Sequence, residues 1–282
     1  MRQFVSAASP NSKGLLEISG KDFHYLRKVL RLAVGDMINL SLPGGLSQDA
    51  TVCKVDDSSK KITVQICQDQ KSSQAQNAAS GQMRTYMTLL QFIPKPQKME
   101  LIVRQATECG ITNVIPVIGE YTQAGSEKPL QKSDRFDRIV REARQQSGSQ
   151  VETKIFSPMK LSEALELVER GDFLPETFGQ EENSSQAQNA AAASLAKIVL
   201  YERGEKTSPL STALFGQGND RPKGQKPRAC VFAIGSEGGI SPAEFELLLS
   251  KGFKAVHFNT NILRCETAAL YAAAAIQSAL DN

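Results

Sequence analysis

Two short stretches near the end of the chain combine residue types that can hold a ligand and act on it. The first, residues 234–239 (IGSEGG), follows the apolar run 229–234, and the second, residues 259–268 (NTNILRCETA), follows another β-rich segment. Residues 241–244 (SPAE) are typical of a helix start. The Ser side chain caps the first turn, Pro is favoured at the first helical position, and the Glu side chain accepts a hydrogen bond from the backbone N–H of the Ser. Glycines in such a strand-to-helix loop leave backbone groups open to a ligand.

The glycines alone do not identify that ligand. The loop has neither the GxxxxGK[ST] spacing of a phosphate-binding loop nor the GxGxxG spacing of a dinucleotide site. As a pair, however, the two loops resemble the C-terminal knot of the SPOUT methyltransferases, and most closely the ribosomal RNA small subunit methyltransferase E family. Residues 24–36, 95–110 and 142–148 are similar to other blocks of that family, so the resemblance covers nearly the whole chain.

The resemblance implies an α/β fold, α+β overall, in which a PUA/OB-like β-barrel precedes a SPOUT domain with a trefoil knot. It implies methylation of N3 of a uridine in the 16S rRNA of the small ribosomal subunit, with S-adenosylmethionine as cofactor. It also implies a homodimer whose interface completes the cofactor pocket. The cofactor contacts expected from the resemblance are Leu200, Ile234, Gly235, Glu237, Gly238, Gly239, Asn259, Ile262, Leu263 and Thr267.

Two residues of the second loop are the catalytic candidates for this reaction. Loss of the uracil N3 proton needs a group that accepts it or stabilises the resulting anion. Arg264 is expected to hold that anion or a substrate phosphate, and a salt bridge to Glu266 or Glu237 is the alternative. Glu266 is either the proton acceptor or the cap of the helix from Thr267 onward, which the preference of carboxylates for helix N-termini favours. His257 lies in an apolar strand, which predicts a packed core histidine.

Basic residues in the first third of the chain and in two later helices are the candidates for RNA contact. If residues 22–32 are helical, one face carries four of them and the opposite face carries Phe23, Leu26 and Leu30. A solvated helix face is the ordinary interpretation, and the family resemblance favours phosphate contact. The expected RNA-binding residues are His24, Arg27, Lys28, Arg31, Lys95 and Arg144.

The elements that position these residues fall into two predicted domains. Period-two alternation at 49–55 and 61–66 predicts β-structure, so residues 1–71 are expected to form the barrel. A polar, low-complexity run at 72–82 is the expected linker. Beyond it, residues 83–282 alternate between predicted strands and helices, typical of a parallel sheet. Within this domain we expect an insertion at about 176–196, which repeats the octapeptide SSQAQNAA of the linker, and an irregular loop at 203–228.

Composition agrees with a cytoplasmic protein that has neither a membrane span nor a metal site. The net charge is only +3, and the first ten residues lack the apolar core of a secretion signal. The five cysteines form no CxxC pair, which favours reduced thiols over disulfides or zinc ligands. Two other functions stay open: a SPOUT enzyme acting on another base or on a ribose 2′-OH, and a non-catalytic RNA-binding protein, against which the two intact loops speak.

Overall fold

The computed structural model divides into two compact units. It describes residues 3–43, 47–67, 85–131, 133–175, 178, 195–202, 206–216 and 226–281. The first unit comprises Met1–Met83 together with Arg144–Gln150, and the second comprises Arg84–Ala143 and Val151–Asn282. The predicted linker at 72–82 lies outside the described residues.

The first unit is a curled five-stranded sheet with one helical segment. Its strands are β1 (Gln3–Val5), β2 (Leu15–Ser19), β3 (Met37–Ser41), β4 (Ser47–Asp56) and β5 (Lys61–Ile66), paired in the order β1-β3-β4-β5-β2. The helical segment is α1 (Gly20–His24), continued by the π-helix η1 (Tyr25–Val29). The alternating side chains of β5 turn one face of this strand toward the core. Ile62 and Val64 are fully buried, whereas Lys61 is exposed. Phe23 and Leu26 join this core, as the helical pattern predicts.

The second unit is built on a parallel sheet of seven strands. They are β6 (Tyr86–Phe92), β7 (Asn113–Ile118), β8 (Lys154–Ile155), β9 (Met159–Lys160), β10 (Leu195–Leu200), β11 (Ala229–Ile234) and β12 (Lys254–Val256). The pairing order is β12-β10-β11-β6-β7-β8, with β9 also paired to β7. The chain therefore extends the sheet first on the β7 side of β6 and later on the β11 side. The order reverses between β6 and β11, the position at which open α/β sheets bind ligands.

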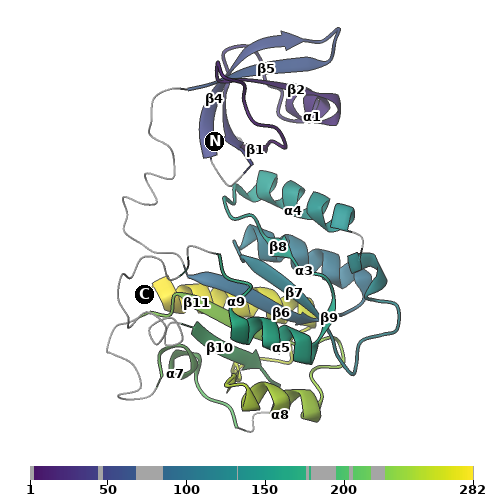
Figure 1. Ribbon diagram of the computed structural model, residues 1–282, viewed down its shortest axis with the longest axis vertical. Helices are drawn as coiled ribbons and strands as arrows, with labels where there is room; N and C mark the ends of the chain where they lie inside the picture. The colour runs from purple at the N-terminus through teal and green to yellow at the C-terminus, as the bar shows by residue number, and fades with distance from the viewer. Residues whose placement is uncertain are drawn as a thin grey trace. The chain divides into compact units, whose positions relative to one another are not determined.

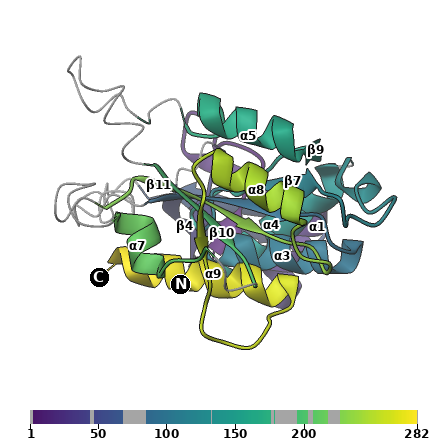
Figure 2. The ribbon, with the colours of Figure 1, turned by 90° about the horizontal axis from the view of Figure 1, so that it is seen from below.

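Helices cover both faces of this sheet (Figures 1 and 2). On one face lie α3 (Pro96–Glu108), α4 (Ser133–Ser147), α7 (Leu210–Phe215) and α9 (Cys265–Asp281), and on the other lie α5 (Leu161–Arg170) and α8 (Pro242–Ser250). A short 3₁₀ helix, η2 (Lys128–Gln131), precedes α4. Successive residues of a strand serve opposite layers: Phe232 packs against the α3 and α9 side, and Val231 against the α5 and α8 side. Burial on both faces explains why β11 is a continuous apolar run.

Part of the predicted irregular loop is helical. The stretch 203–228 contains α7, whose Ala213 and Leu214 are buried in the core on the α9 side of the sheet. The glycine and proline content that suggested an irregular loop lies mostly outside this short helix. The predicted insertion at about 176–196 falls almost entirely outside the described residues.

Candidate active site

A pocket opens at the carboxyl edge of the parallel sheet, where β10, β11 and β12 end. Because the carboxyl ends of parallel strands meet at one edge, the loops that follow them converge there. The glycine-rich loop after β11 forms one wall, and the loop after β12 forms another. The lining residues are Leu200, Tyr201, Glu202, Ile234, Gly235, Ser236, Gly239, Val256, His257, Phe258, Thr260, Asn261, Ile262, Leu263, Cys265 and Ala268.

The glycine-rich loop is a tight turn closed on itself. Gly239 N–H donates to the Ser236 carbonyl oxygen at 3.1 Å. A Cβ on Gly235 would lie 2.6 Å from the backbone carbon of Gly239, so the loop has no room for a side chain there. Gly239 has φ +81°, which favours glycine, and a Cβ there would lie 3.0 Å from Glu202 Oε1. The turn itself therefore requires these two glycines, and their backbone forms part of the pocket wall.

The structure brings together six of the ten expected cofactor contacts. Leu200, Ile234, Gly235, Gly239, Ile262 and Leu263 line the pocket, whereas Glu237, Gly238, Asn259 and Thr267 are not among the lining residues. Glu202 and His257, which follow β10 and β12, also line the pocket. The sequence motifs did not predict a ligand contact for either residue. His257 is exposed, with Nδ1 3.3 Å from the Tyr201 carbonyl oxygen, so the prediction of a packed core histidine is wrong. The strand ends one residue before it, at Val256.

Lys98 joins the two loops of the pocket through a pair of carboxylates. Its Nζ lies 3.4 Å from Glu237 Oε1 in the first loop and 3.4 Å from Glu266 Oε2 at the start of α9. Glu237 Oε1 also accepts a hydrogen bond from the Lys95 backbone N–H at 3.2 Å, at the N-terminus of α3. One lysine from α3 thus links the two loops that form the pocket walls.

The same contacts bear on the two interpretations of Glu266. Partial burial alone would raise its pKa, but hydrogen bonds from its own backbone N–H, from Cys265 and from Lys98 outweigh this and lower the pKa. Three donors that favour the charged form fit a carboxylate at the start of α9 better than a proton acceptor. Burial, together with the hydrogen bond and charge of Glu266, raises the pKa of the Cys265 thiol to about 12, so that thiol stays protonated at neutral pH.

Replacing Lys98 with methionine is expected to weaken cofactor binding about fivefold to tenfold, because two partly buried ion pairs that hold the pocket walls are lost together. The pKa of Glu266 should rise when Lys98 is removed. As the pH is lowered, the variant should therefore lose cofactor binding at a higher pH than the unchanged chain does. Calorimetric titration with S-adenosylmethionine across pH 4–8 measures both effects. Lys98→Arg keeps the charge and should restore most of the affinity; equal affinity in the methionine variant would refute the role.

Arg264 forms neither of the salt bridges that were considered for it. Its side chain is exposed, and among the described residues no ion pair to it is found; Lys98 occupies both carboxylates instead. Its backbone is engaged, since the carbonyl oxygen accepts from Ala268 N–H at 2.7 Å. Arg264 thus lies in the chain between the pocket-lining residues Leu263 and Cys265, and its exposed side chain is accessible to a substrate.

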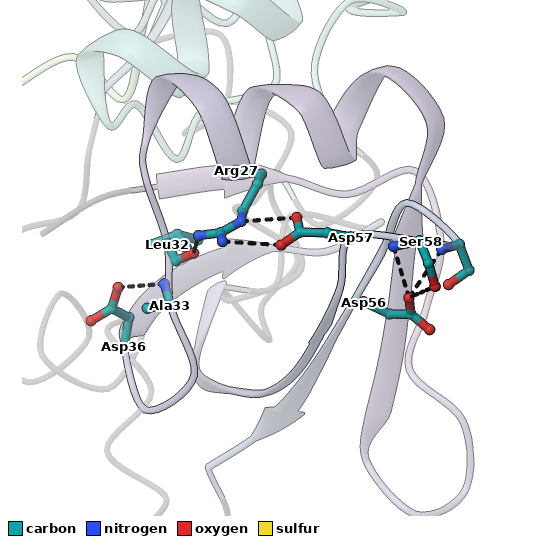
Figure 3. A network of polar contacts seen from close by, with 8 residues as sticks. Arg27, Leu32, Ala33, Asp36, Asp56, Asp57 and Ser58 are labelled. Atoms are coloured by element: carbon teal, nitrogen blue, oxygen red, sulfur yellow. Dashed lines mark hydrogen bonds and ion pairs between the residues drawn. The ribbon is translucent and has the colours of Figure 1, made fainter.

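In the first unit, Arg27 is committed to internal contacts (Figure 3). Its Nε and Nη2 donate to the two oxygens of Asp57, each at 3.1 Å, and its Nη1 donates to the Leu32 carbonyl oxygen at 3.2 Å. The prediction of one basic helix face extending to Arg31 is also wrong. The segment η1 is a π-helix that ends at Val29, and Arg31 lies beyond it with φ +55°. His24, Lys28 and Arg31 remain exposed.

The two later RNA-contact candidates have different surroundings. Arg144 is only 4% exposed, and its Nη2 donates to Ser41 Oγ at 2.8 Å within the first unit. A buried guanidinium is not placed to bind an RNA phosphate, so the prediction for Arg144 is wrong. The sequence around Arg144 gives no sign of the Ser41 hydroxyl to which it donates. Lys95 is exposed at the N-terminus of α3, beside Glu237 of the glycine-rich loop.

Arg144→Met is expected to lower the free energy of unfolding by about 2 kcal/mol, because buried hydrogen bonds of a charged group are lost. It should leave the salt dependence of RNA affinity unchanged. Lys28→Ala should do the opposite, reducing the slope of log affinity against log salt by about one with little effect on stability. Thermal unfolding and RNA titrations at several salt concentrations check both variants. A reduced slope of log affinity against log salt for Arg144→Met would show that Arg144 contacts RNA after all.

Comparison with known proteins identifies the family. Residues 82–277, which include every residue of the pocket, match the RNA methyltransferase domain family. The chain belongs to this family. Ribosomal RNA small subunit methyltransferase E of Aquifex aeolicus is 32% identical over 183 residues, 64% of this chain and 64% of that relative, just under two thirds of its length. The protein of that name from Synechocystis is 29% identical over 281 residues, 99% of this chain and 78% of the relative. The family expected from the two loops is thereby confirmed.

Solved structures of similar proteins have the same fold. Ribosomal RNA small subunit methyltransferase E from Neisseria gonorrhoeae, crystallised with S-adenosylmethionine, has a TM-score of 0.70 to this chain at 23% identity and matches over 99% of this chain and 97% of that one. A methyltransferase from Legionella pneumophila, solved with the same cofactor, has a TM-score of 0.66 at 22% identity, over 99% and 96% of the two chains. The predicted α/β architecture is confirmed; the trefoil knot remains a prediction.

Two features are absent from the described part of the chain. No helix in it is long and apolar enough to cross a bilayer. Among the same residues, no group of three or more His, Cys, Asp or Glu side chains is arranged to hold a metal ion.

Proposed function

We propose that this chain transfers the methyl group of S-adenosylmethionine to N3 of a uridine in the 16S rRNA of the small ribosomal subunit. The observation that carries the proposal is the pocket at the carboxyl edge of the sheet, walled by both motif loops, in a chain of the RNA methyltransferase family. The relatives named above act on small-subunit rRNA by name, and two similar structures hold this cofactor.

The pocket residues fit such a cofactor. Apolar walls from Leu200, Ile234 and Leu263 suit a flat purine, and the glycine backbone supplies polar groups without side chains. The Glu202 carboxylate, which faces Gly239, places a negative charge in a site for a ligand that carries a positive sulfonium. When bound, the cofactor supplies an electrophilic methyl group.

The remaining work of the reaction falls to the chain's own residues. The pocket walls orient the donor, and Lys98 links the two loops that form the walls. Arg264, which is exposed and has no ion pair among the described residues, is assigned to stabilise the negative charge that develops on the uracil ring as the N3 proton leaves. The lowered pKa of Glu266 favours its ionised form at the start of α9, and we therefore assign the N3 proton to solvent rather than to this carboxylate.

We also infer a homodimer that works in the cytoplasm, where ribosomal subunits are found. Exposed apolar side chains on α3 and α9 support the dimer, because Leu101, Leu270 and Tyr271 are 38%, 36% and 45% exposed on helices that pack against each other. Sedimentation of Leu270→Glu against the unchanged chain tests this, with dissociation to a monomer as the expected result.

The test of the function is methyl transfer from labelled S-adenosylmethionine to small subunits and to naked rRNA, followed by mass spectrometry of the nucleosides. We expect the label in 3-methyluridine. Label in another base or in a 2′-O-methylated ribose would keep the methyltransferase and change its target. Cofactor binding without transfer to any RNA would overturn the proposal and favour a non-catalytic RNA-binding protein.

A further inference from the structure

Tyr121 is an exposed aromatic residue that lies against the glycine-rich loop. It belongs to the turn after β7, and a Cβ on Gly238 would lie 2.8 Å from Tyr121 Cβ and 3.0 Å from its Cγ. Gly238 does not have a positive φ, so the turn itself does not require glycine there. The missing side chain makes room for the tyrosine, yet the tyrosine remains 44% exposed.

The turn that carries Tyr121 is held in place by one carboxylate. Glu244 Oε1 accepts from the Glu120 backbone N–H at 2.7 Å, while Glu244 Oε2 accepts from Ser241 N–H at 2.9 Å. Within the turn, Gly119 N–H donates to Thr122 Oγ1 at 2.9 Å. The N-terminus of α8 thus fixes the Tyr121 backbone, and a side chain on a fixed turn loses little entropy when a ligand packs on it.

An exposed lysine approaches the same loop from another element. Lys95 contacts Glu237 through its backbone, and Tyr121 contacts Gly238, so α3 and the β7 turn reach consecutive residues of the loop. The Lys95 side chain is exposed. An aromatic side chain and a lysine that reach the same loop match the two parts of a single-stranded nucleotide, its base and its phosphate. Among the described residues only Tyr121 and Tyr271 are exposed phenyl or phenol side chains, and Tyr271 lies on α9.

We propose that Tyr121 stacks on an unpaired pyrimidine of the RNA substrate at the edge of the methyl-transfer pocket, with Lys95 near its phosphate. The proposal rests on the proposed function in that the base arrives at this pocket. An enzyme that modifies a base must take it out of its stack, and an aromatic side chain replaces the lost stacking partner.

The chain has no tryptophan, so Tyr121→Trp introduces a single indole at this site. Titration with oligouridylate should quench its fluorescence by at least about half, because a stacked base quenches an indole. Inorganic polyphosphate, which has the charge without the bases, should leave it unchanged. Tyr86→Trp is the control. Tyr86 is the first residue of β6, at the edge of the sheet away from the pocket, so an indole there should not respond. Binding of oligouridylate without quenching at position 121 would overturn the proposal.

Two further variants separate stacking from packing. Tyr121→Leu keeps an apolar contact with Gly238, and Tyr121→Phe keeps the ring. The leucine variant should lose about tenfold in kcat/KM for RNA, with unchanged affinity for S-adenosylmethionine, and the phenylalanine variant should behave as the unchanged chain. Equal kcat/KM in the leucine variant would refute the stacking role and leave the methyltransferase assignment intact. Absent methyl transfer in the unchanged chain would refute the proposed function, and the quenching experiment would then decide the stacking role by itself.

Discussion

Replacing Gly235 with alanine is expected to raise the dissociation constant for S-adenosylmethionine at least about 100-fold, with a similar loss of methyl transfer. The new Cβ would lie 2.6, 2.8 and 2.9 Å from three backbone atoms of Gly239. Backbone cannot rotate away as a flexible side chain can, so the turn must open and displace a wall of the pocket. Calorimetric titration with the cofactor measures the loss directly.

Gly252→Ala is the matched control for this variant. Gly252 lies in the same unit just after α8 and has φ +81°, and a Cβ there would meet no atom within 4 Å. Alanine at this position should cost about 1 kcal/mol of stability through its backbone conformation alone and leave cofactor affinity unchanged. If Gly235→Ala bound the cofactor as the unchanged chain does, the loop after β11 would not form the cofactor pocket.

Local signals in the sequence predict much of the sheet. The predicted strands at 61–66 and 229–234 have the same bounds as β5 and β11, the first from its alternation and the second from its apolar run. The predicted helix start at 241–244 is confirmed, since Ser241 Oγ accepts from Glu244 N–H and the glutamate returns a bond. These features depend on a few consecutive residues, which is why the sequence shows them.

The choice of partners for charged residues could not be predicted in the same way. The sequence offers Glu237 and Glu266 as alternative partners of Arg264, whereas the fold brings Lys98 from α3 to both of them. Arg144 is expected from the sequence to contact RNA and is instead buried against Ser41. The turn of β7 gave no motif, so Tyr121 was recognised only from its packing on Gly238. Each of these contacts joins segments far apart in the chain.

Arg264→Ala is expected to lower kcat by about 100-fold to 1000-fold, the range for removing one donor that stabilises a developing anion. Affinity for S-adenosylmethionine should not change, because Arg264 is exposed and is not among the lining residues of the pocket. The variant should regain part of its rate as the pH rises, since uracil then ionises at N3 without help from the protein. Single-turnover methyl transfer between pH 6 and 10 measures both the loss and the recovery.

The two roles considered for Arg264 predict different patterns in the same experiment. A contact to the developing anion lowers kcat and changes the pH dependence, whereas a contact to a phosphate raises KM and reduces the salt slope of RNA affinity by about one. Arg264→Lys separates them further, because a lysine still attracts a phosphate but lacks the guanidinium fork. A lysine variant with full kcat and an alanine variant with only a raised KM would place Arg264 on the RNA backbone and leave charge stabilisation at N3 to another group.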